Sequence, residues 1–370
     1  MTPEMAINIT RLSVAFSFCW PVPASSSRGR VLFMKIVLVV ATISGFMLVS
    51  LLMYGAYVHF GDLILTSKCV CLTMCVSQFV MQTIICLAKY ETLQHVVDEL
   101  MTYVKQAQQY ERDTLCTYID KCNRFYGGYI AVVYTTLIAF LLGPLVVPVP
   151  FPLDAEYPFS VNYTPVYVIL YFHQALICFQ CAGHTCISLF AALLLFFTVA
   201  RFECLAMEFE KSRNIDMLIV CIKKQLHLRR YAEDVISCFR FVVFYAIIVS
   251  TCGLTFCGII FLMNLSMTVK LQFVTICMTG LVEMYLFAWP ADHIKDMSEK
   301  VSRSGYNGKW YEATLEMQKC LLNVLVYQEP VIFSINCVVP EFSLPYYCSY
   351  LSNAFSIFTT LRIALDDNSV

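Results

Sequence analysis

The sequence predicts an all-α membrane protein with seven transmembrane helices and the N-terminus inside the cell. Of its 370 residues, 59% are hydrophobic and only 14% are charged, a composition outside the range of soluble domains. Only helices and closed barrels satisfy their backbone in lipid, and the short alternating segments typical of a barrel are missing. We therefore expect helices in the runs that lack charged side chains, which are 36–61, 69–88, 125–153, 157–200, 241–269, 271–282 and 342–361.

Taken in order, the spans predicted from these runs are long enough to cross a bilayer, which needs about 20 apolar residues. The polar segments 89–121 and 203–231 are helical in pattern and are expected to continue neighbouring spans into water. The segment 148–165 carries five prolines, which predict a rigid, non-helical outer loop. The segment Ile9–Pro23 is expected to form a short interfacial or re-entrant helix on the inner side. The predicted spans are 31–57, 63–87, 125–147, 166–199, 236–263 and 271–289, followed by the C-terminal stretch.

The basic residues set the orientation. Of the 25 Lys and Arg residues, 22 fall on the side of the N-terminus, and Lys68, Lys270 and Arg362 fall on the other. By the positive-inside rule the N-terminus is cytosolic, and seven spans then put the C-terminus outside. The sequons at Asn162 and Asn264 lie on the predicted outer side, where glycosylation is expected.

The stretch 343–365 has a polar stripe at helical spacing. Asn353, Ser356 and Thr360 share one face, and a membrane helix must turn such a face toward protein or water. One interpretation is hydrogen bonding between helices through small residues. The other is that several copies line a shared aqueous pore, with Ile363 or Ala364 one turn nearer the outer mouth.

Catalytic and metal-binding motifs do not stand out. Most of the 19 cysteines lie inside apolar runs, where free cysteine packs as a small apolar residue. Cys178 and Cys181, followed by His184, lack the second pair that a zinc site needs. We therefore expect no enzyme activity, cofactor or metal, and the net charge of −1 argues against nucleic acid. Glu283 lies within a span and is a candidate for gating or for a structural ion pair.

Two regions resemble the insect odorant receptors. One is the segment Glu156–Leu176, EYPFSVNYTPVYVILYFHQAL. The other is the C-terminal third, which resembles the family's pattern of the last inner loop and seventh helix through the following residues in order: Trp289-Pro-Ala-Asp-His-Ile, Ser298, Tyr306, Trp310-Tyr311, Gln328-Glu329-Pro330, Tyr350 and Phe355-Ser-Ile-Phe-Thr-Thr-Leu-Arg362.

The resemblance implies an odorant-gated, non-selective cation channel rather than an enzyme. Such a chain is expected to be the tuning subunit of a hetero-tetramer with an olfactory coreceptor, in the plasma membrane of olfactory sensory neurons. The seventh helix would divide into an inner part, 311–328, and a pore part, 345–365, with Pro330 and Pro340 at the break. The implied regions are an N-terminus at 1–30, helices one to six at 31–290, an inner loop and anchor at 291–340, and the pore helix and C-terminus at 341–370.

The resemblance also implies a pocket for a small volatile among the outer halves of spans two, three, four and six. Burial of apolar surface would supply affinity, and one or two polar contacts would orient the ligand. Ordinary helix packing is the alternative for each residue. The candidate ligand-binding residues are Cys69, Thr73, Met74, Tyr134, Leu137, Ile138, Leu141, Phe172, His173, Leu176, Phe273, Ile276 and Cys277.

Three other functions fit the sequence less well. A gustatory-type receptor would usually carry a Thr-Tyr…Gln-Phe ending, which this sequence lacks. A G-protein-coupled receptor would have the opposite orientation. A transporter would need internal repeats, and none is evident. The chain also lacks a long cytosolic insertion before span five, which argues against the coreceptor itself.

Overall fold

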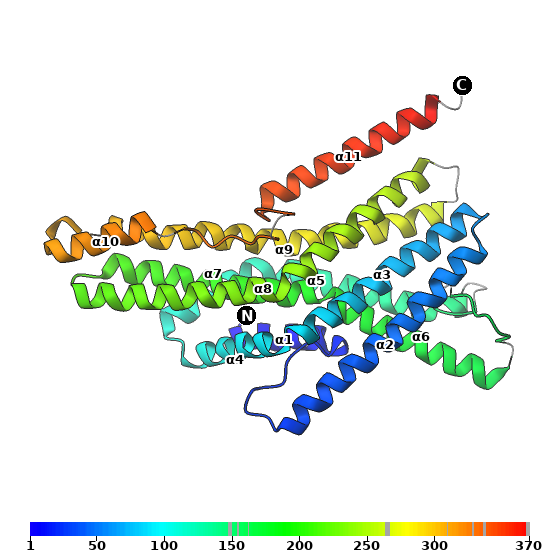
Figure 1. Cartoon of the computed structure of the whole chain (residues 1–370), viewed down its shortest axis with the longest axis horizontal. Helices are drawn as coiled ribbons and strands as arrows, with labels where there is room; N and C mark the ends of the chain where they lie inside the picture. Colours follow the sequence, from blue (N-terminus) through cyan, green and yellow to red (C-terminus); the bar gives the residue numbers. More distant parts are fainter. Residues whose placement is uncertain are drawn as a thin grey trace.

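The computed structural model describes residues 1–146, 150–153, 155–161, 163–262, 267–308, 310–327, 329–335 and 338–367, and these residues form an almost entirely helical bundle (Figure 1). An isolated bridge pairs Ile335 with Val339. In chain order, the elements are α1 (Pro3–Ser13), η1 (Ala15–Ser17), α2 (Arg28–Val58), α3 (Leu63–Ala88), α4 (Tyr90–Gln106), α5 (Gln109–Val146), α6 (Thr164–Thr185), α7 (Ile187–Lys211), α8 (Ile215–Leu262), α9 (Met267–Asn307), η2 (Trp310–Glu312), α10 (Leu315–Tyr327) and α11 (Leu344–Asp367).

Six helical stretches of the described chain are long and apolar enough to cross a membrane, and they correspond to the six spans predicted between 31 and 289. The stretches are Arg28–Val58, Ile64–Ala88, Gln109–Leu145, Thr164–Lys211, Ile215–Phe261 and Phe273–Asn307. At 1.5 Å per residue, α8 with its 48 residues is about 70 Å long, more than twice the hydrocarbon thickness of a bilayer. One end of the bundle must therefore project into water.

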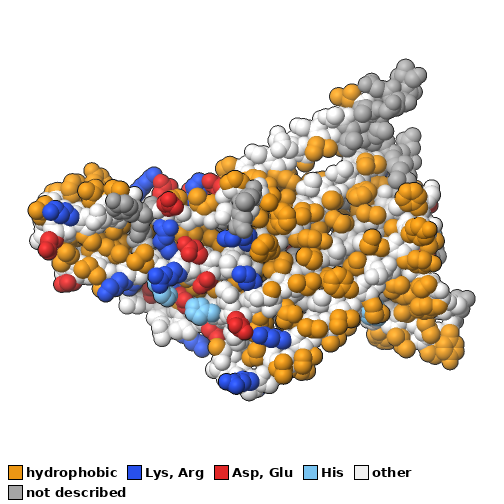
Figure 2. All heavy atoms as spheres, viewed as in Figure 1, with side chains coloured by type: hydrophobic (Ala, Val, Ile, Leu, Met, Phe, Trp, Pro, Cys, Tyr) orange, Lys and Arg blue, Asp and Glu red, His pale blue; other side chains and the backbone are white. Residues whose placement is uncertain are grey.

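Charged side chains mark that projecting end. Figure 2 shows Lys, Arg, Asp and Glu gathered over α4, α10 and the neighbouring halves of α7, α8 and α9, whereas hydrophobic side chains cover the rest of this face. Ion pairs hold the projecting helices together, including Arg201 with Glu99 at 2.8 Å and Lys224 with Glu208 at 2.7 Å. The apolar half has the surface expected of a lipid-facing bundle.

The centre of the bundle is α7. Each side chain from Ile187 to Ala200 is buried, and a helix that is hydrophobic all round belongs in a core. Phe190 meets the ring of Phe239 edge-on at 5.7 Å, and Phe196 meets Trp289 at 5.0 Å, so aromatic pairs join α7 to α8 and α9. This packing explains why cysteine suits the bundle: the described cysteines are free thiols, and most are buried.

The predicted helix Ile9–Pro23 was wrong in its bounds. The side chain of Thr2 accepts from the Met5 amide and caps a helix that begins at Pro3. It ends at Ser13, and one further 3₁₀ turn stops where Phe18 adopts a left-handed φ of 57°. The N-terminal segment still packs against the bundle, because the backbone of η1 contacts α6 at Gly183.

Other boundaries also differ from expectation. The polar segment 89–121 is helical as predicted, but it is divided into α4 and the start of α5, which are separated at residues 107–108. The sixth span continues as helix beyond Trp289 to Asn307, with Pro290 inside it. After α10, no helix is present in the described residues between 329 and 343, where Pro330 and Pro340 lie. The sequon residues Asn162 and Asn264 lie outside the described residues, as does Gln328.

Candidate functional site

The last helix, α11, packs on α8 and α9 through one face only. The hydroxyl of Tyr350 donates to Ser250 Oγ of α8 at 3.1 Å, and that of Tyr347 donates to the Leu281 carbonyl of α9 at 3.2 Å. Further along, the Phe358 ring lies against Gly258, where an added Cβ would come within 3.3 Å of it. These contacts recur at the spacing of one helix face, and beyond them α11 projects away from the bundle (Figure 1).

The polar stripe lies on the other side of α11. Asn353, Ser356 and Thr360 are exposed; at about 100° per residue Ser356 and Thr360 fall away from Tyr350 and Phe358, and Asn353 lies at the edge of the stripe nearer Tyr350. The Thr360 hydroxyl donates to the Ser356 carbonyl at 2.9 Å, and the Ser356 hydroxyl donates to the Ser352 carbonyl at 3.0 Å. Because these hydroxyl protons bond within the helix, the oxygen lone pairs remain available on the exposed side.

Ile363, the next pore candidate, is 62% exposed, and the side chain of Ala364 lies outside the described part of the chain. Phe355 and Ile357 are also exposed, at 69% and 49%. The uncovered surface of α11 therefore mixes a polar stripe with apolar flanks. In the described part of the single chain, no other segment covers this surface of α11.

The segment before α11 lies along α9. The Val331 amide donates to Ser298 Oγ at 2.9 Å, and Lys295 forms an ion pair with Glu341 at 2.7 Å. Within the segment, the Phe342 amide donates to the Phe333 carbonyl at 2.7 Å. These bonds couple the start of α11 to α9, so a shift of α9 would be transmitted to the last helix.

The predicted ligand residues divide into two groups. Ile138, Phe172 and Leu176 are 54%, 69% and 50% exposed and face out of the chain. The other ten are buried or half-buried on α3, α5, α6 and α9. Their role in binding stays a prediction.

Several of the inward group already have a polar partner. His173 Nε2 lies 3.0 Å from Ser44 Oγ, which joins α6 to α2. The Tyr134 hydroxyl donates to the Ser13 carbonyl at 2.7 Å and so holds the N-terminal segment. The Thr73 hydroxyl donates to a carbonyl of its own helix at 2.7 Å.

A second, separate core cluster contains one of the predicted ligand residues, Phe273. Phe273 is 2% exposed and packs with Cys71 and Ile260, with Phe256 and Cys257 against them. The Cys277 thiol donates to the Gly253 carbonyl at 3.2 Å on α8. This small cluster joins α3, α8 and α9 apart from the main core, and it contacts the same two helices that carry α11.

Within the described part of the chain, Glu283 is held by hydrogen bonds and not by the ion pair considered from the sequence. The Glu283 side chain is buried, at 5% exposure. Both of its carboxylate oxygens accept a hydrogen bond from Gln78 Nε2 at 2.9 Å, and Oε1 also accepts one from Gln82 Nε2 at 3.4 Å. The two glutamines were not among the predicted site residues, although their spacing of four within an apolar run is a usable signal. The cluster ties α3 to α9 in the middle of the bundle.

The outer loop between α5 and α6 is held down by one buried side chain. Gln174 is fully buried; its Oε1 accepts from the Leu153 amide and its Nε2 donates to the Tyr157 hydroxyl, both at 2.9 Å. Burial raises the pKa of Tyr157, so this hydroxyl stays neutral. His59 Nε2 lies 3.0 Å from Glu156 Oε1 and fastens the loop to the end of α2.

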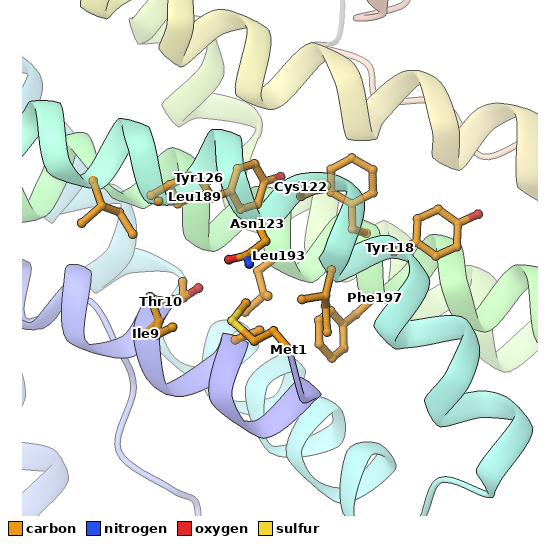
Figure 3. Close-up of a pocket in the computed structure, with 15 residues that line it drawn as sticks. Met1, Ile9, Thr10, Tyr118, Cys122, Asn123, Tyr126, Leu189, Leu193 and Phe197 are labelled. Carbon is orange, nitrogen blue, oxygen red and sulfur yellow. The ribbon is translucent and has the colours of Figure 1, made fainter.

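Two cavities lie toward the charged end. One, of about 100 Å³, lies between α1, α5 and α7 and has an almost wholly apolar lining (Figure 3). The other, of about 510 Å³, is polar and is lined by α4 with Arg201 and His227. Arg201 stacks on the Tyr103 ring at 4.7 Å, and burial raises the pKa of Tyr103, whose hydroxyl donates to Glu111 at 3.1 Å. Neither cavity is lined by any of the thirteen predicted ligand residues.

Comparison with known proteins supplies the context for this bundle. A family model described as 7tm Odorant receptor matches residues 61–355. The fold is similar to that of the insect olfactory receptor OR5 from Machilis hrabei, with a TM-score of 0.83, 16% identity, and coverage of 97% of both chains. The structure of that receptor in complex with eugenol matches with a TM-score of 0.76, 15% identity and the same coverage. A search of curated protein sequences returns no match.

Proposed function

Because the chain belongs to the insect odorant receptor family, whose members are olfactory ion channels and not enzymes, we propose that it is the odorant-binding subunit of a ligand-gated cation channel whose pore is lined by α11. In this proposal the chain assembles with a coreceptor into a hetero-tetramer in the plasma membrane of olfactory sensory neurons. The family match, which covers well over half of the chain, favours an odorant receptor over a gustatory-type receptor.

One observation carries the pore proposal. The exposed stripe of Asn353, Ser356 and Thr360 faces away from the chain's own bundle. In lipid, uncovered polar groups are costly, so this face needs protein or water. Packing of several α11 helices around one axis supplies both, because the stripes then surround water that carries cations. Small polar side chains without fixed charge suit a non-selective pore.

We further propose that the pore has its outer mouth at the C-terminal end of α11 and that the N-terminus is cytosolic. The charged, projecting end of the bundle supports this orientation, since basic residues favour the cytosolic side. Asn162 and Asn264 would then be available for glycosylation.

The ligand that we propose is a small aromatic or weakly polar volatile. A receptor of the same fold binds eugenol, and the candidate pocket here combines aromatic rings with the His173 imidazole and the Thr73 hydroxyl. Binding would shift the channel toward its open state only as far as the ligand prefers that state. Moving a channel from about 1% open to nearly full opening takes roughly 5 kcal/mol of differential binding. A single small ligand is therefore expected to open the pore only in part.

The test is current recording from cells that express the chain with and without a coreceptor. We expect cation currents evoked by small volatiles, with eugenol as the first probe, only when both chains are present. Currents that need a G protein, or a surface-accessible tag at the N-terminus of intact cells, would overturn the proposal.

A further inference from the structure

The cavity beneath the N-terminal helix is not used by the pore or by the predicted odorant pocket. We call it the α1 cavity; its lining includes Ile9 and Thr10 of α1, Cys122 and Gly127 of α5, and Leu193 and Phe197 of α7 (Figure 3). Its volume of about 100 Å³ is below the roughly 150 Å³ that accepts benzene. The space therefore suits a short length of hydrocarbon chain rather than a compact ring.

The cavity opens sideways, between α1 and α5. Of its lining residues, Ile9 is 42% exposed, and Asn123 and Gly127 are exposed as well. A Cβ added to Gly127 would meet nothing within 4 Å, so open space continues at this position. The mouth lies where the charge-free run of α5 begins, at Phe125, which is the level of a membrane surface.

The outer face of α1 is also apolar. Met5 and Leu12 are 53% and 74% exposed, on the same side as Ile9. Exposed apolar side chains at helical spacing are typical of a helix that lies in the membrane interface. The mouth of the α1 cavity thus opens beside a surface suited to lipid rather than to water.

Basic side chains are present on α1 and α5, the two helices that form the mouth of the α1 cavity. Arg11 at the end of α1 and Lys121 and Arg124 on α5 are exposed, and the Lys121 ammonium lies over the ring of Tyr118 at 5.2 Å. Two acidic residues nearby are already paired: Asp120 lies 3.0 Å from the amino group of Met1, and Glu4 of α1 pairs with Arg112 at 2.7 Å. Basic side chains at the inner membrane surface favour anionic lipid headgroups.

From this combination we propose that an anionic phospholipid binds at the α1 cavity, with a short length of one acyl chain in the cavity and its headgroup among Arg11, Lys121 and Arg124. The occupant must be both apolar and anionic, because the lining is apolar and the rim is cationic. A bound lipid there would hold α1 against α5 and α7. This site is independent of the pore and of the odorant pocket.

Adjacent glycines supply a matched pair of variants. Gly127 lines the cavity, whereas Gly128 does not, and both are exposed with open space around an added Cβ. Leu at either position raises helix propensity equally. Only Gly127→Leu places four carbons at the mouth of the cavity.

The experiment is photolabelling of the purified full chain in mixed micelles with a phosphatidylserine that carries a diazirine in its acyl chain, followed by peptide mapping. We expect label on α1, α5 or α7 at the cavity. We expect labelling to fall by at least about fivefold in Gly127→Leu, since close-packed atoms leave no room for the chain, and to stay within about twofold in Gly128→Leu. Unlabelled phosphatidylserine should compete better than phosphatidylcholine, and Lys121→Gln with Arg124→Gln should abolish that preference.

Equal labelling of the wild type and Gly127→Leu would overturn the site in the cavity. Equal competition by phosphatidylcholine would overturn the anionic headgroup. Displacement of the label by a small volatile, but not by phosphatidylserine, would assign the cavity to a volatile ligand and overturn the lipid. Elution of both Leu variants with the wild type on size exclusion would establish that lost labelling is not lost folding.

Discussion

Replacement of Thr360 by Leu tests the pore at one side chain. Thr360 is exposed, and its hydroxyl donates within its own helix at 2.9 Å, so Leu removes no contact with the rest of the chain. We therefore expect the free energy of unfolding to change by less than about 0.5 kcal/mol. In a pore, however, Leu removes an oxygen that a passing cation can use and adds an apolar branch.

A hydrogen bond to a charged group contributes about 1.5–3 kcal/mol, and water in the pore would replace part of it. A net rise of about 1 kcal/mol in the barrier to permeation corresponds to roughly a fivefold fall in single-channel conductance. The assay is single-channel recording with the coreceptor, at surface expression matched to the wild type. Ligand potency should hardly move, because the candidate pocket lies on other helices.

Thr359→Leu is the matched control. Thr359 is the adjacent residue, is also exposed, and donates to the Ser356 carbonyl at 2.8 Å, but it lies at the edge of the stripe. We expect a clearly smaller change in conductance. Unchanged conductance in Thr360→Leu would remove Thr360 from the pore, and an equal effect in both variants would show that the proposed register of α11 is wrong.

Three further outcomes follow from the packing. Gly183→Ala should destabilise the bundle and expose the N-terminal segment to protease, because the new Cβ would lie 2.6 Å from the Ser17 backbone nitrogen; Gly128→Ala should instead stabilise by about 0.5–1 kcal/mol, and equal melting temperatures would contradict this. Leu194→Ala, at the fully buried centre of α7, should lower the free energy of unfolding by about 2–5 kcal/mol in thermal melts; a change below 1 kcal/mol would argue against α7 as the core. His173→Phe should shift odorant potency several-fold, and superimposable concentration–response curves would discard His173 from the pocket.

The spans were predictable because each depends on local composition. Runs without charge gave six helices whose positions agree with the structure, and the polar stripe of α11 is visible as a spacing of three and four. Cys178, Cys181 and His184 were expected to pack, and His184 indeed lies buried with Nε2 at 3.1 Å from Thr83 Oγ1. Charge counting also anticipated a charged end that projects from the apolar part of the bundle.

What sequence patterns missed depends on contacts between distant segments. The partners of Glu283, two glutamines about 200 residues earlier, follow from the packing of α3 on α9 and not from any local pattern. The cap at Thr2 and the left-handed turn at Phe18 shifted the first helix away from its predicted bounds. Pro290 did not end α9, because tertiary packing carries a helix through a proline that local preference would place at a boundary. The α1 cavity is formed by residues of three helices, so no single stretch of the sequence predicts it.

The most direct test of the pore proposal is the reversal potential of channels that carry Asn353→Asp. The substitution keeps the size of the side chain and adds a negative charge to the exposed stripe of α11. Under bi-ionic conditions with calcium outside and sodium inside, we predict a positive shift of the reversal potential, because a carboxylate in the pore favours the divalent cation. The reversal potential does not depend on how many channels reach the surface. Robust odorant-evoked currents with an unchanged reversal potential would contradict the proposal that α11 lines the pore.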